Sequence, residues 1–431
     1  MKEVIRRIGA RREAIAWTLV GILAVSLIAS LTFGDNDDSS LAATGGPVLS
    51  NSTTSNNAPL GSENSTSSSV ASSAGSGPTT SAPTATAATG GSSTAVPTGP
   101  LRTVGPGQMY STLQQALDAA QPGDVVELTT TGAHKGPAKS VRSGTPDRPI
   151  TVTAVAGARL DCGSPKEGEV ARCFELNHSY FRFQKFAITG GSSNLYLVGV
   201  TAGSYVHDVK ILQSVFRGAQ GTGECIRVKY QAFNVEIAGN DIADCGIGKC
   251  CKDSKNGEAV YIGTAPEQLA EKNPTSEPDR THDIWVHHNV MRPYNECVDI
   301  KEASYNNLIE YNDCSGQRDP DSAGMGSRGG RVGEGNTFRF NLVEKTTGAC
   351  ARFGGDEDPD GTGNSFYGNR CRDISGEWGV AQQRSPQHYV CGNTFEGSRP
   401  EEGLSRDKKV DPTAGCAAEV PRNTTGLIGA G

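Results

Sequence analysis

Short stretches in which apolar and polar residues alternate recur along the chain from about residue 101. Eight of them carry one polar residue at a matching place, namely Gln184, Gln213, Asn240, Asn289, Asn312, Asn341, Asn369 and Asn393. The successive gaps are 29, 27, 49, 23, 29, 28 and 24 residues, and the longest gap holds a Pro-rich, charged insertion that begins at Thr264. A period of this length indicates a solenoid of stacked repeats. The alternation indicates that the repeats are built from short strands.

A second alternating stretch follows many of these polar residues, as in ECIRVKY, EAVYIGT, ECVDIKE, GMGSRGG and ACARFGG. Two or more short strands per repeat, stacked along one axis, predict an all-β, parallel β-helix. An asparagine that recurs in every rung can form hydrogen bonds with its counterparts in the rungs above and below. We therefore interpret the recurring asparagines as structural rather than catalytic.

The segment YSTLQQALDAAQPGDVVEL precedes the first expected strand and has helical rather than strand periodicity. Ser111 and Gln114 are spaced as a capping box. Leu113, Ala116, Leu117 and Ala120 fall on one helical face. We expect a short N-terminal capping helix that covers the unpaired edge of the first rung.

Stacking the second strands in register predicts which side chains point outward together. If the apolar pairs such as Val260/Ile262 and Val298/Ile300 face inward, one outward column holds Arg227, Tyr261, Asp299, Gly326 and Arg352. The next outward column holds Lys229, Gly263, Lys301, Arg328 and Gly354.

Neighbouring rungs are about 4.8 Å apart, so Lys301 and Arg328 should emerge side by side, with Asp299 beside Lys301. Like charges so placed repel each other unless an anion binds, and Gly263 and Gly354 leave room for one. A ligand site for an anion is the interpretation that we favour; a solvated, salt-bridged face is the alternative.

The first 34 residues have the pattern of a membrane signal anchor. Residues 14–33 carry no charge, and 20 residues of helix rise about 30 Å, the thickness of a bilayer core. The preceding residues are basic, which favours a cytoplasmic N-terminus. We expect a single-pass protein of the cell membrane with an extracellular C-terminal domain; a cleaved signal peptide and secretion is the alternative.

Residues 35–100 are rich in Ser, Thr, Ala, Gly and Pro and contain almost no large apolar side chains. Such a segment cannot bury enough surface to offset chain entropy, so we expect a disordered stalk. The β-helix domain would then be residues 101–431. Asn51, Asn64, Asn177 and Asn423 lie in N-x-[ST] sequons, which predicts a glycoprotein if the host modifies such sites.

Charge and cysteine content narrow the function classes. The whole chain has a net charge of -7, of which residues 101–431 carry -6, since residues 1–34 carry +3 and residues 35–100 carry -4. An acidic domain argues against a nucleic-acid binder. All 12 cysteines lie between Cys162 and Cys416, which predicts disulfides on the exported side. Cys162 with Cys173 is the favoured pair, and the other pairings stay open. We expect a monomer.

Several of these segments resemble pectate-lyase-like right-handed β-helix proteins: the opening YSTLQQALDAAQPGDVVEL, the stretch SGTPDRPITVTAVAGARLDC, and ECVDIKEASYNNLIEYNDCSG. The resemblance implies a right-handed, single-stranded solenoid over roughly residues 103–397. The DIK and SRG tripeptides look similar to those of alginate- and chondroitin-lyase-type enzymes, which place a Lys and an Arg on neighbouring rungs, often with a carboxylate-bound calcium ion. Carried over, Lys301 would be the base and Arg328 the charge stabiliser or acid.

The chemistry that fits such a pair is β-elimination on an acidic, uronate-containing polysaccharide. A base removes the proton next to the carboxylate, and the developing anion must be stabilised. Lys301 acts as a base only when neutral, and a cationic neighbour such as Arg328 lowers the pKa of a lysine. The expected substrate-binding residues, which complete this site, are Asp299, Arg352, Tyr261, Lys229 and Arg227.

Acidic loops near this column suggest Ca2+, which prefers several oxygen ligands. The candidate ligands are Asp313, Asp319, Asp321, Asp356 and Asp358. Two alternatives to a lyase remain. A glycoside hydrolase would use two carboxyl groups, for example Asp299 with Asp321 or Asp356. A non-catalytic surface protein would bind glycans without cleaving them.

Overall fold

The computed structural model describes residues 99–166, 169–221, 223–247, 257–330, 335–354, 360–384, 386–397 and 403–421. The predicted anchor, the predicted stalk except its last two residues, and the sequons at Asn51, Asn64 and Asn423 lie outside the described residues. Within these ranges the structure contains no helix with the length and apolar character needed to span a membrane. The remaining sequon residue, Asn177, is buried, and its Nδ2 donates to the carbonyl of Val198 at 2.6 Å. A glycan on Asn177 therefore does not fit the folded domain.

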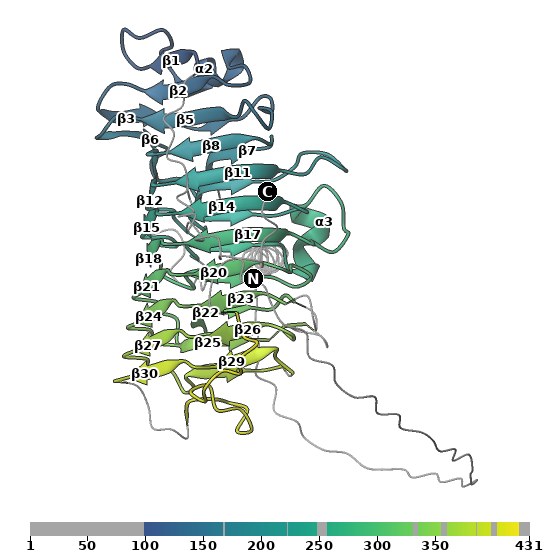
Figure 1. Ribbon diagram of the computed structural model, residues 1–431. Helices are drawn as coiled ribbons and strands as arrows, with labels where there is room; N and C mark the ends of the chain where they lie inside the picture. Colours follow the sequence, from purple (N-terminus) through teal and green to yellow (C-terminus); the bar gives the residue numbers. More distant parts are fainter. Residues whose placement is uncertain are drawn as a thin grey trace, which may run out of the picture. The chain divides into compact units, whose positions relative to one another are not determined.

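The described chain winds into a right-handed parallel β-solenoid (Figure 1). Each full turn gives one strand to each of three sheets, which we call A, B and C in the order that the chain visits them.

Sheet A consists of β1 (Leu101–Val104), β2 (Val125–Leu128), β5 (Ile150–Ala154), β8 (Phe181–Gln184), β11 (His207–Leu212), β14 (Phe233–Ala238), β17 (His282–His287), β20 (Leu308–Glu310), β23 (Thr337–Arg339), β26 (Ser365–Tyr367) and β29 (Tyr389–Cys391). Sheet B consists of β3 (Gly132–Lys135), β6 (Ala158–Asp161), β9 (Ala187–Thr189), β12 (Val215–Arg217), β15 (Asp241–Ala243), β18 (Val290–Arg292), β21 (Asp313–Ser315), β24 (Leu342–Glu344), β27 (Arg370–Arg372) and β30 (Thr394–Glu396). Sheet C consists of β4 (Ala138–Lys139), β7 (Arg172–Leu176), β10 (Ser193–Leu197), β13 (Ile226–Val228), β16 (Val260–Ile262), β19 (Val298–Ile300), β22 (Ala323–Ser327), β25 (Ala349–Phe353) and β28 (Val380–Gln382).

The core is a stack of inward-facing apolar columns. In sheet A, Val286, Ile309, Phe338 and Phe366 pair in register from rung to rung and are completely buried. Because strand side chains alternate between the two faces, each rung's outward residues are then fixed as well. The repeat predicted from the sequence is therefore confirmed, with a third strand per turn, in sheet B, directly after each recurring asparagine.

A short helix, α2 (Leu113–Ala119), precedes β2 and contacts β1, β2 and β4. Its N-cap is Thr112, whose side chain and that of Gln115 form a capping box. The helix thus begins one residue later than the Ser111/Gln114 spacing predicted, because Thr112 is the last residue with extended backbone angles. Its buried face contains Leu113, Ala116 and Leu117.

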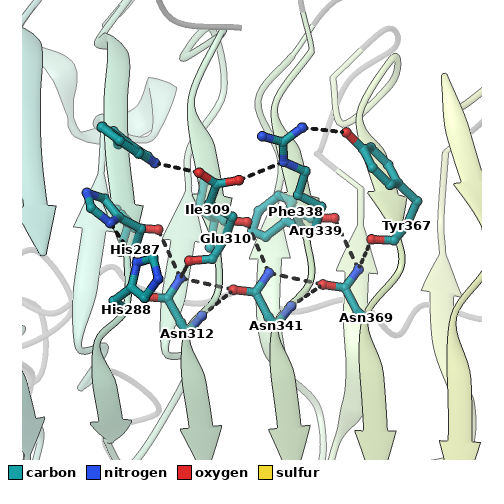
Figure 2. Close-up of polar contacts among 12 residues, drawn as sticks. His287, His288, Ile309, Glu310, Asn312, Phe338, Arg339, Asn341, Tyr367 and Asn369 are labelled. Carbon is teal, nitrogen blue, oxygen red and sulfur yellow. Dashed lines mark hydrogen bonds and ion pairs between the residues drawn. The ribbon is translucent and has the colours of Figure 1, made fainter. Parts of the chain in front are cut away.

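The recurring asparagines form a hydrogen-bonded ladder at the corner between sheets A and B. The Nδ2 of each asparagine donates to the Oδ1 of the next at 2.9–3.0 Å, in the order Asn240, Asn289, Asn312, Asn341, Asn369 and Asn393. Figure 2 shows three of these rungs. All six side chains are buried, so the ladder satisfies polar groups that the corner would otherwise leave unpaired. Their structural interpretation is confirmed.

The two glutamines that we aligned with the ladder do not belong to it. The residue before each ladder asparagine has a positive φ, for example 66° at Gly239 and 54° at His288. Gln213 itself has a φ of 49° and so corresponds to Gly239. Ser214 takes the ladder position and donates its backbone N–H to Asn240 Oδ1 at 2.9 Å. Gln184 is similarly one position ahead of Lys185, whose φ is 52°.

Disulfides occupy alternate rungs between sheets B and C. Of the five described bridges, three join a residue at the start of a sheet C strand to sheet B or the residues just after it: Cys225–Cys245, Cys297–Cys314 and Cys350–Cys371. The other two are Cys162–Cys173 and Cys391–Cys416. The Cys162–Cys173 pairing expected from the sequence is confirmed. Cys250 and Cys251 lie outside the described residues.

Small residues stand between the bridged rungs. The strand register places Asn194, Ala259, Gly324 and Gly379 in the same column as Cys173, Cys225, Cys297 and Cys350, one rung apart. A Cβ on Gly324 would lie 2.3 Å from a methyl group of Val343. A side chain of any size at this position would therefore force the neighbouring rungs apart.

The insertion, residues 264–281, leaves the corner between sheets C and A directly after Gly263. It contains a 3-10 turn, η1 (Pro266–Gln268), and one turn of helix, α3 (Leu269–Lys272). Asp279 fixes its far end, because its carboxylate accepts the backbone N–H groups of Tyr230 at 2.8 Å and Gln231 at 3.1 Å. The insertion is therefore tied to the preceding rung.

Candidate functional site

The predicted outward columns lie on sheet C in the predicted register. Arg227, Tyr261, Asp299, Gly326 and Arg352 pair one after another along β13, β16, β19, β22 and β25. The neighbouring column continues the register, because Lys301 N donates to Ile262 O at 2.8 Å and Arg328 N to Ile300 O at 2.7 Å. Lys301 and Arg328 thus stand on consecutive rungs, about 4.8 Å apart.

Asp299 lies between the two columns and pairs with Lys301. Its Oδ2 is 3.2 Å from Nζ of Lys301, as the sequence predicted. Both groups are buried, and the nearby carboxylate of Asp299 raises the pKa of Lys301 well above its ordinary value, against burial and the repulsion of Arg328. The expectation that Arg328 would lower that pKa on balance was wrong, because the closer anion outweighs the cation.

Two further carboxylates complete a buried acidic triad. Oxygen atoms of Glu258, Glu296 and Asp299 lie within 4.8 Å of one another, and all three residues are buried. Burial and the neighbouring carboxylates raise the pKa of Glu258 well above its usual range and also raise that of Glu296. The pKa of Asp299 is lowered, chiefly by Lys301 and Arg328 against the effect of burial. Crowded carboxylates of this kind are costly without a cation.

The donor set fits a hard divalent cation such as Ca2+. Glu296 Oε2 and Asp299 Oδ1 are buried and accept no hydrogen bond from the described residues, so two oxygen atoms are left with ligand capacity. Glu258 is oriented by hydrogen bonds from Gly257 N and Asn295 Nδ2. Oxygen ligands from several carboxylates are what Ca2+ requires.

The aspartates that we proposed as metal ligands do not form this group. Among the described residues, the triad is the cluster with metal-ligand spacing. Asp313 lies on β21 in sheet B, and Asp319 instead accepts the backbone N–H of Asp321 at 2.9 Å, which closes a turn. Asp356 and Asp358 lie outside the described residues. The acidic loops were conspicuous in the sequence, whereas Glu258 and Glu296 are separated by the insertion.

Arg352 reaches the same cluster from the next rung. Its Nη2 is 3.3 Å from Glu296 Oε1, and its Nη1 donates to the carbonyl of Asp321 at 3.0 Å. The Arg352 side chain is only partly buried. It therefore stands where the triad opens toward the C-terminal rungs, in a position to meet a carboxylate group of a ligand.

The residues on the N-terminal side of Lys301 are occupied by one another. The guanidinium of Arg227 lies 3.6 Å from the ring centroid of Tyr261, and Nζ of Lys301 lies 4.9 Å from it. Arg227 also forms an ion pair with Glu224. Neither the ring face of Tyr261 nor the guanidinium of Arg227 is open for a sugar in this structure. Burial and Arg227 lower the pKa of Lys229 to about 6, and this lysine is fully enclosed.

Glu302 is a candidate residue that the sequence analysis missed. It is 3 % exposed, and neither carboxylate oxygen accepts a hydrogen bond from the described part of the chain. Burial raises its pKa to about 7, although Lys301 and Arg328 act in the opposite direction. A buried carboxyl group that changes charge near neutral pH is typical of functional sites. Its place directly after Lys301 was the available signal.

A surface cavity of about 590 Å3 lies next to this region, at the corner between sheets C and A. It is lined by Tyr205, Gln231, Phe233, Glu277, Pro278, Arg280, His282 and Tyr305. Neither Lys301 nor Arg328 lines it. The insertion therefore separates this cavity from the charged columns.

No protein-family model matches the chain, and no curated protein matches it. Among solved structures, an alginate lyase from Paenibacillus sp. str. FPU-7 is similar over 66% of this chain and 95% of its own, with 16% identity and a TM-score of 0.53. A GH136 lacto-N-biosidase from Eubacterium ramulus is similar over 73% of this chain and 67% of its own, with 14% identity and a TM-score of 0.43. A pectate lyase is similar over 74% of this chain and 85% of its own, with 12% identity and a TM-score of 0.40. At these identities the likeness concerns the fold: the chain is a pectate-lyase-like parallel β-helix.

Proposed function

We propose that the domain is a polysaccharide lyase that cleaves a uronate-containing polymer by β-elimination at Lys301 and Arg328. The observation that carries the proposal is the placement of two cations on consecutive rungs beside a buried carboxylate triad. The solved structure with the TM-score of 0.53 is an alginate lyase, and it supports a lyase only through the shared fold. The charged residues of this chain carry the argument.

The proposed reaction breaks the C–O bond on the side of the leaving sugar. A base takes the proton next to the uronate carboxylate, the electron pair forms a C=C bond, and the leaving oxygen takes a proton. Arg328 stays charged at all accessible pH values, so we assign it the developing anion. Lys301 is the candidate base, and it must first lose the proton that Asp299 holds on it. Arg352 would bind a substrate carboxylate.

A divalent cation at Glu258, Glu296 and Asp299 would supply positive charge beside the substrate carboxylate. Whether or not it is bound, Glu258 and Glu296 keep the acidic side of the site fixed, since Glu296 also accepts from Ser322 and Arg352.

Access is the requirement that this structure leaves to a ligand-bound state. Lys301 is 6 % exposed and Arg328 8 % exposed. A polymer can reach them only if the surrounding segments open. The proposal therefore includes an opening of the site when substrate binds.

The proposed function is tested by incubating the full chain with a panel of uronate polysaccharides, with and without a chelator. New unsaturated, ultraviolet-absorbing ends are the expected result. Replacing Lys301 or Arg328 by Met should reduce the rate by about 10²–10⁴-fold, whereas Lys210→Met on sheet A should leave it unchanged. Binding without any turnover in the wild type would instead identify a non-catalytic glycan-binding protein, which is the alternative that the sequence left open.

A glycoside hydrolase is the second candidate because the triad contains carboxyl groups with opposite pKa shifts. Glu258 is held protonated and Asp299 ionised, and such a pair can act as an acid and a nucleophile or base. Their oxygen atoms lie within 4.8 Å, close to the spacing of about 5 Å in retaining enzymes. Asp299 would thus pair with Glu258 rather than with Asp321. New saturated reducing ends would identify this activity.

We also propose, from the sequence alone, that the domain is extracellular and tethered by residues 1–34.

A further inference from the structure

The columns of sheet C are closed on one side of Lys301 and more open on the other. On the N-terminal side, Tyr196 and Arg227 are buried and Lys229 has no exposed surface. On the C-terminal side, Arg352 and Ala381 are partly exposed and Gln383 is exposed. A polymer that lies along these columns therefore meets different surroundings in its two directions from the proposed catalytic pair.

The insertion is what closes the N-terminal side. Nζ of Lys229 donates to the backbone carbonyl of Lys272, the last residue of α3. Lys229 and Lys301 occupy the same column, with only the rung of Gly263 between them. The space between α3 and Lys301 along the axis is thus about two rung spacings, or roughly 10 Å. Such a length holds one or two sugar rings.

The closure is built in rather than loosely laid over the sheet. Asn273 is buried, accepts from Thr264 Oγ1 at 3.2 Å and donates to Asp279 Oδ2 at 3.4 Å. Asp279 in turn holds the amides of Tyr230 and Gln231, which both have positive φ values, 59° and 57°. A backbone conformation that is unfavourable for these residues persists only when its surroundings fix it. The insertion is therefore a rigid wall.

We propose that residues 264–281 form an end wall of the substrate groove and make the enzyme exolytic, so that it removes one or two sugars at a time from a polymer end. This inference rests on the proposed polysaccharide cleavage and adds its mode of action. Polymer enters over the C-terminal rungs, past Arg352, and its terminal sugars stop against α3. Cleavage beside Lys301 then releases only the short piece that fits between the two.

The test is the length distribution of products early in the digestion of a long uronate polymer. The wild-type chain should release mono- or disaccharides from the start, while solution viscosity falls slowly. Intermediate oligosaccharides with a rapid fall in viscosity would overturn the proposal, even though they would confirm cleavage. The absence of any product would instead overturn the proposed function, and this inference with it.

A variant in which residues 266–276 are replaced by a short Gly-Ser linker, with Thr264 and Asp279 retained, should shift the products to longer oligosaccharides. Glu267→Ala combined with Glu271→Ala is the matched control, since both side chains are exposed on the same segment. This control should keep the wild-type pattern. If the linker variant folds, as judged by its thermal transition, and still releases only mono- and disaccharides, the wall is not the cause. If it does not fold, the wild-type product pattern still decides whether cleavage is exolytic.

Discussion

Asp299 lies 3.2 Å from Nζ of Lys301 and at the same time belongs to the triad with Glu258 and Glu296. One carboxylate therefore links the candidate base to the candidate cation site. Its Oδ2 faces the lysine, while its Oδ1 accepts no hydrogen bond from the described residues. A change at Asp299 should consequently affect both the charge on Lys301 and the binding of a metal.

The first prediction concerns the pH dependence of cleavage. If Lys301 is the base, the rate should rise about tenfold per pH unit on the alkaline side of neutrality, because the pKa of Lys301 is raised and only the neutral amine reacts. Asp299→Asn removes the group that raises this pKa and leaves burial and Arg328, which lower it. The variant should therefore reach its maximal rate at a lower pH. A pH–rate profile that does not move would exclude Lys301 as the base.

The second prediction concerns calcium. Millimolar Ca2+ should raise the thermal transition of the folded domain, since a ligand at 100 times its dissociation constant adds about 2.7 kcal/mol to stability. Glu258→Gln should abolish most of this increase. Asp313→Asn, at a site in sheet B outside the triad, should retain it. An equal response to calcium in all three proteins would place the binding site elsewhere.

The third prediction concerns the stability contributed by Glu302. The folded state keeps the proton on Glu302 up to about pH 7, whereas the unfolded chain loses it near pH 4.5. Unfolding therefore releases a proton between these values, and stability falls as the pH rises through this window. The 2.5-unit difference corresponds to a loss on the order of 3 kcal/mol.

Glu302→Gln should remove this part of the pH dependence and should be more stable than the wild type at pH 7 and above. Chemical denaturation at several pH values would measure it. Parallel stability curves for the two proteins from pH 4.5 to 8 would show that Glu302 does not titrate as stated.

The fourth prediction concerns the asparagine ladder. Asn312→Ala removes the acceptor for both Asn289 N and Asn289 Nδ2, and it deprives Val286 O of a donor. Each buried group left unpaired costs about 1–3 kcal/mol, so we expect a loss of several kcal/mol in the free energy of unfolding. Asn306→Gly, at an exposed position with a φ of 53° that suits glycine, should cost much less. Similar losses for the two variants would contradict a structural role for the ladder.

The fold could be predicted from the sequence because the repeat makes the same demand many times. The apolar alternation and the asparagine at each corner recur in rung after rung, so an error in one rung does not change the architecture. Gln184 and Gln213 show the limit of this approach. Both are polar residues near a corner, but the ladder position is set by the residue with positive φ, which the sequence does not mark when that residue is not glycine.

A second ladder, formed by Asn307, Asn336 and Asn364 at the start of sheet A strands, was missed for a similar reason. It spans few rungs, and its period is shared with the first ladder, so it added no separate signal. The register of sheet C, in contrast, followed from the inward apolar pairs, and it placed Lys301, Arg328 and Asp299 correctly.

The charge states within the site could not be predicted from the same pattern. Register shows which side chains are neighbours along a column, but the pKa of Lys301 depends on which of Asp299 and Arg328 is closer and on how far water is excluded. The triad was missed because Glu258 and Glu296 stand just before their strands, at the edge of the alternation. The residues around Lys229 looked open because the path of the insertion is not encoded in the repeat.

The alternate-rung disulfides have a consequence for how such a domain can change in length. Each bridge closes a loop of 11–25 residues within or next to a single turn, and its neighbours in the column must be small. Gain or loss of one turn would bring two bridges, or two small residues, into contact and leave the interior overfilled or hollow. A pair of turns is thus the smallest unit that can be duplicated or deleted with the interior intact.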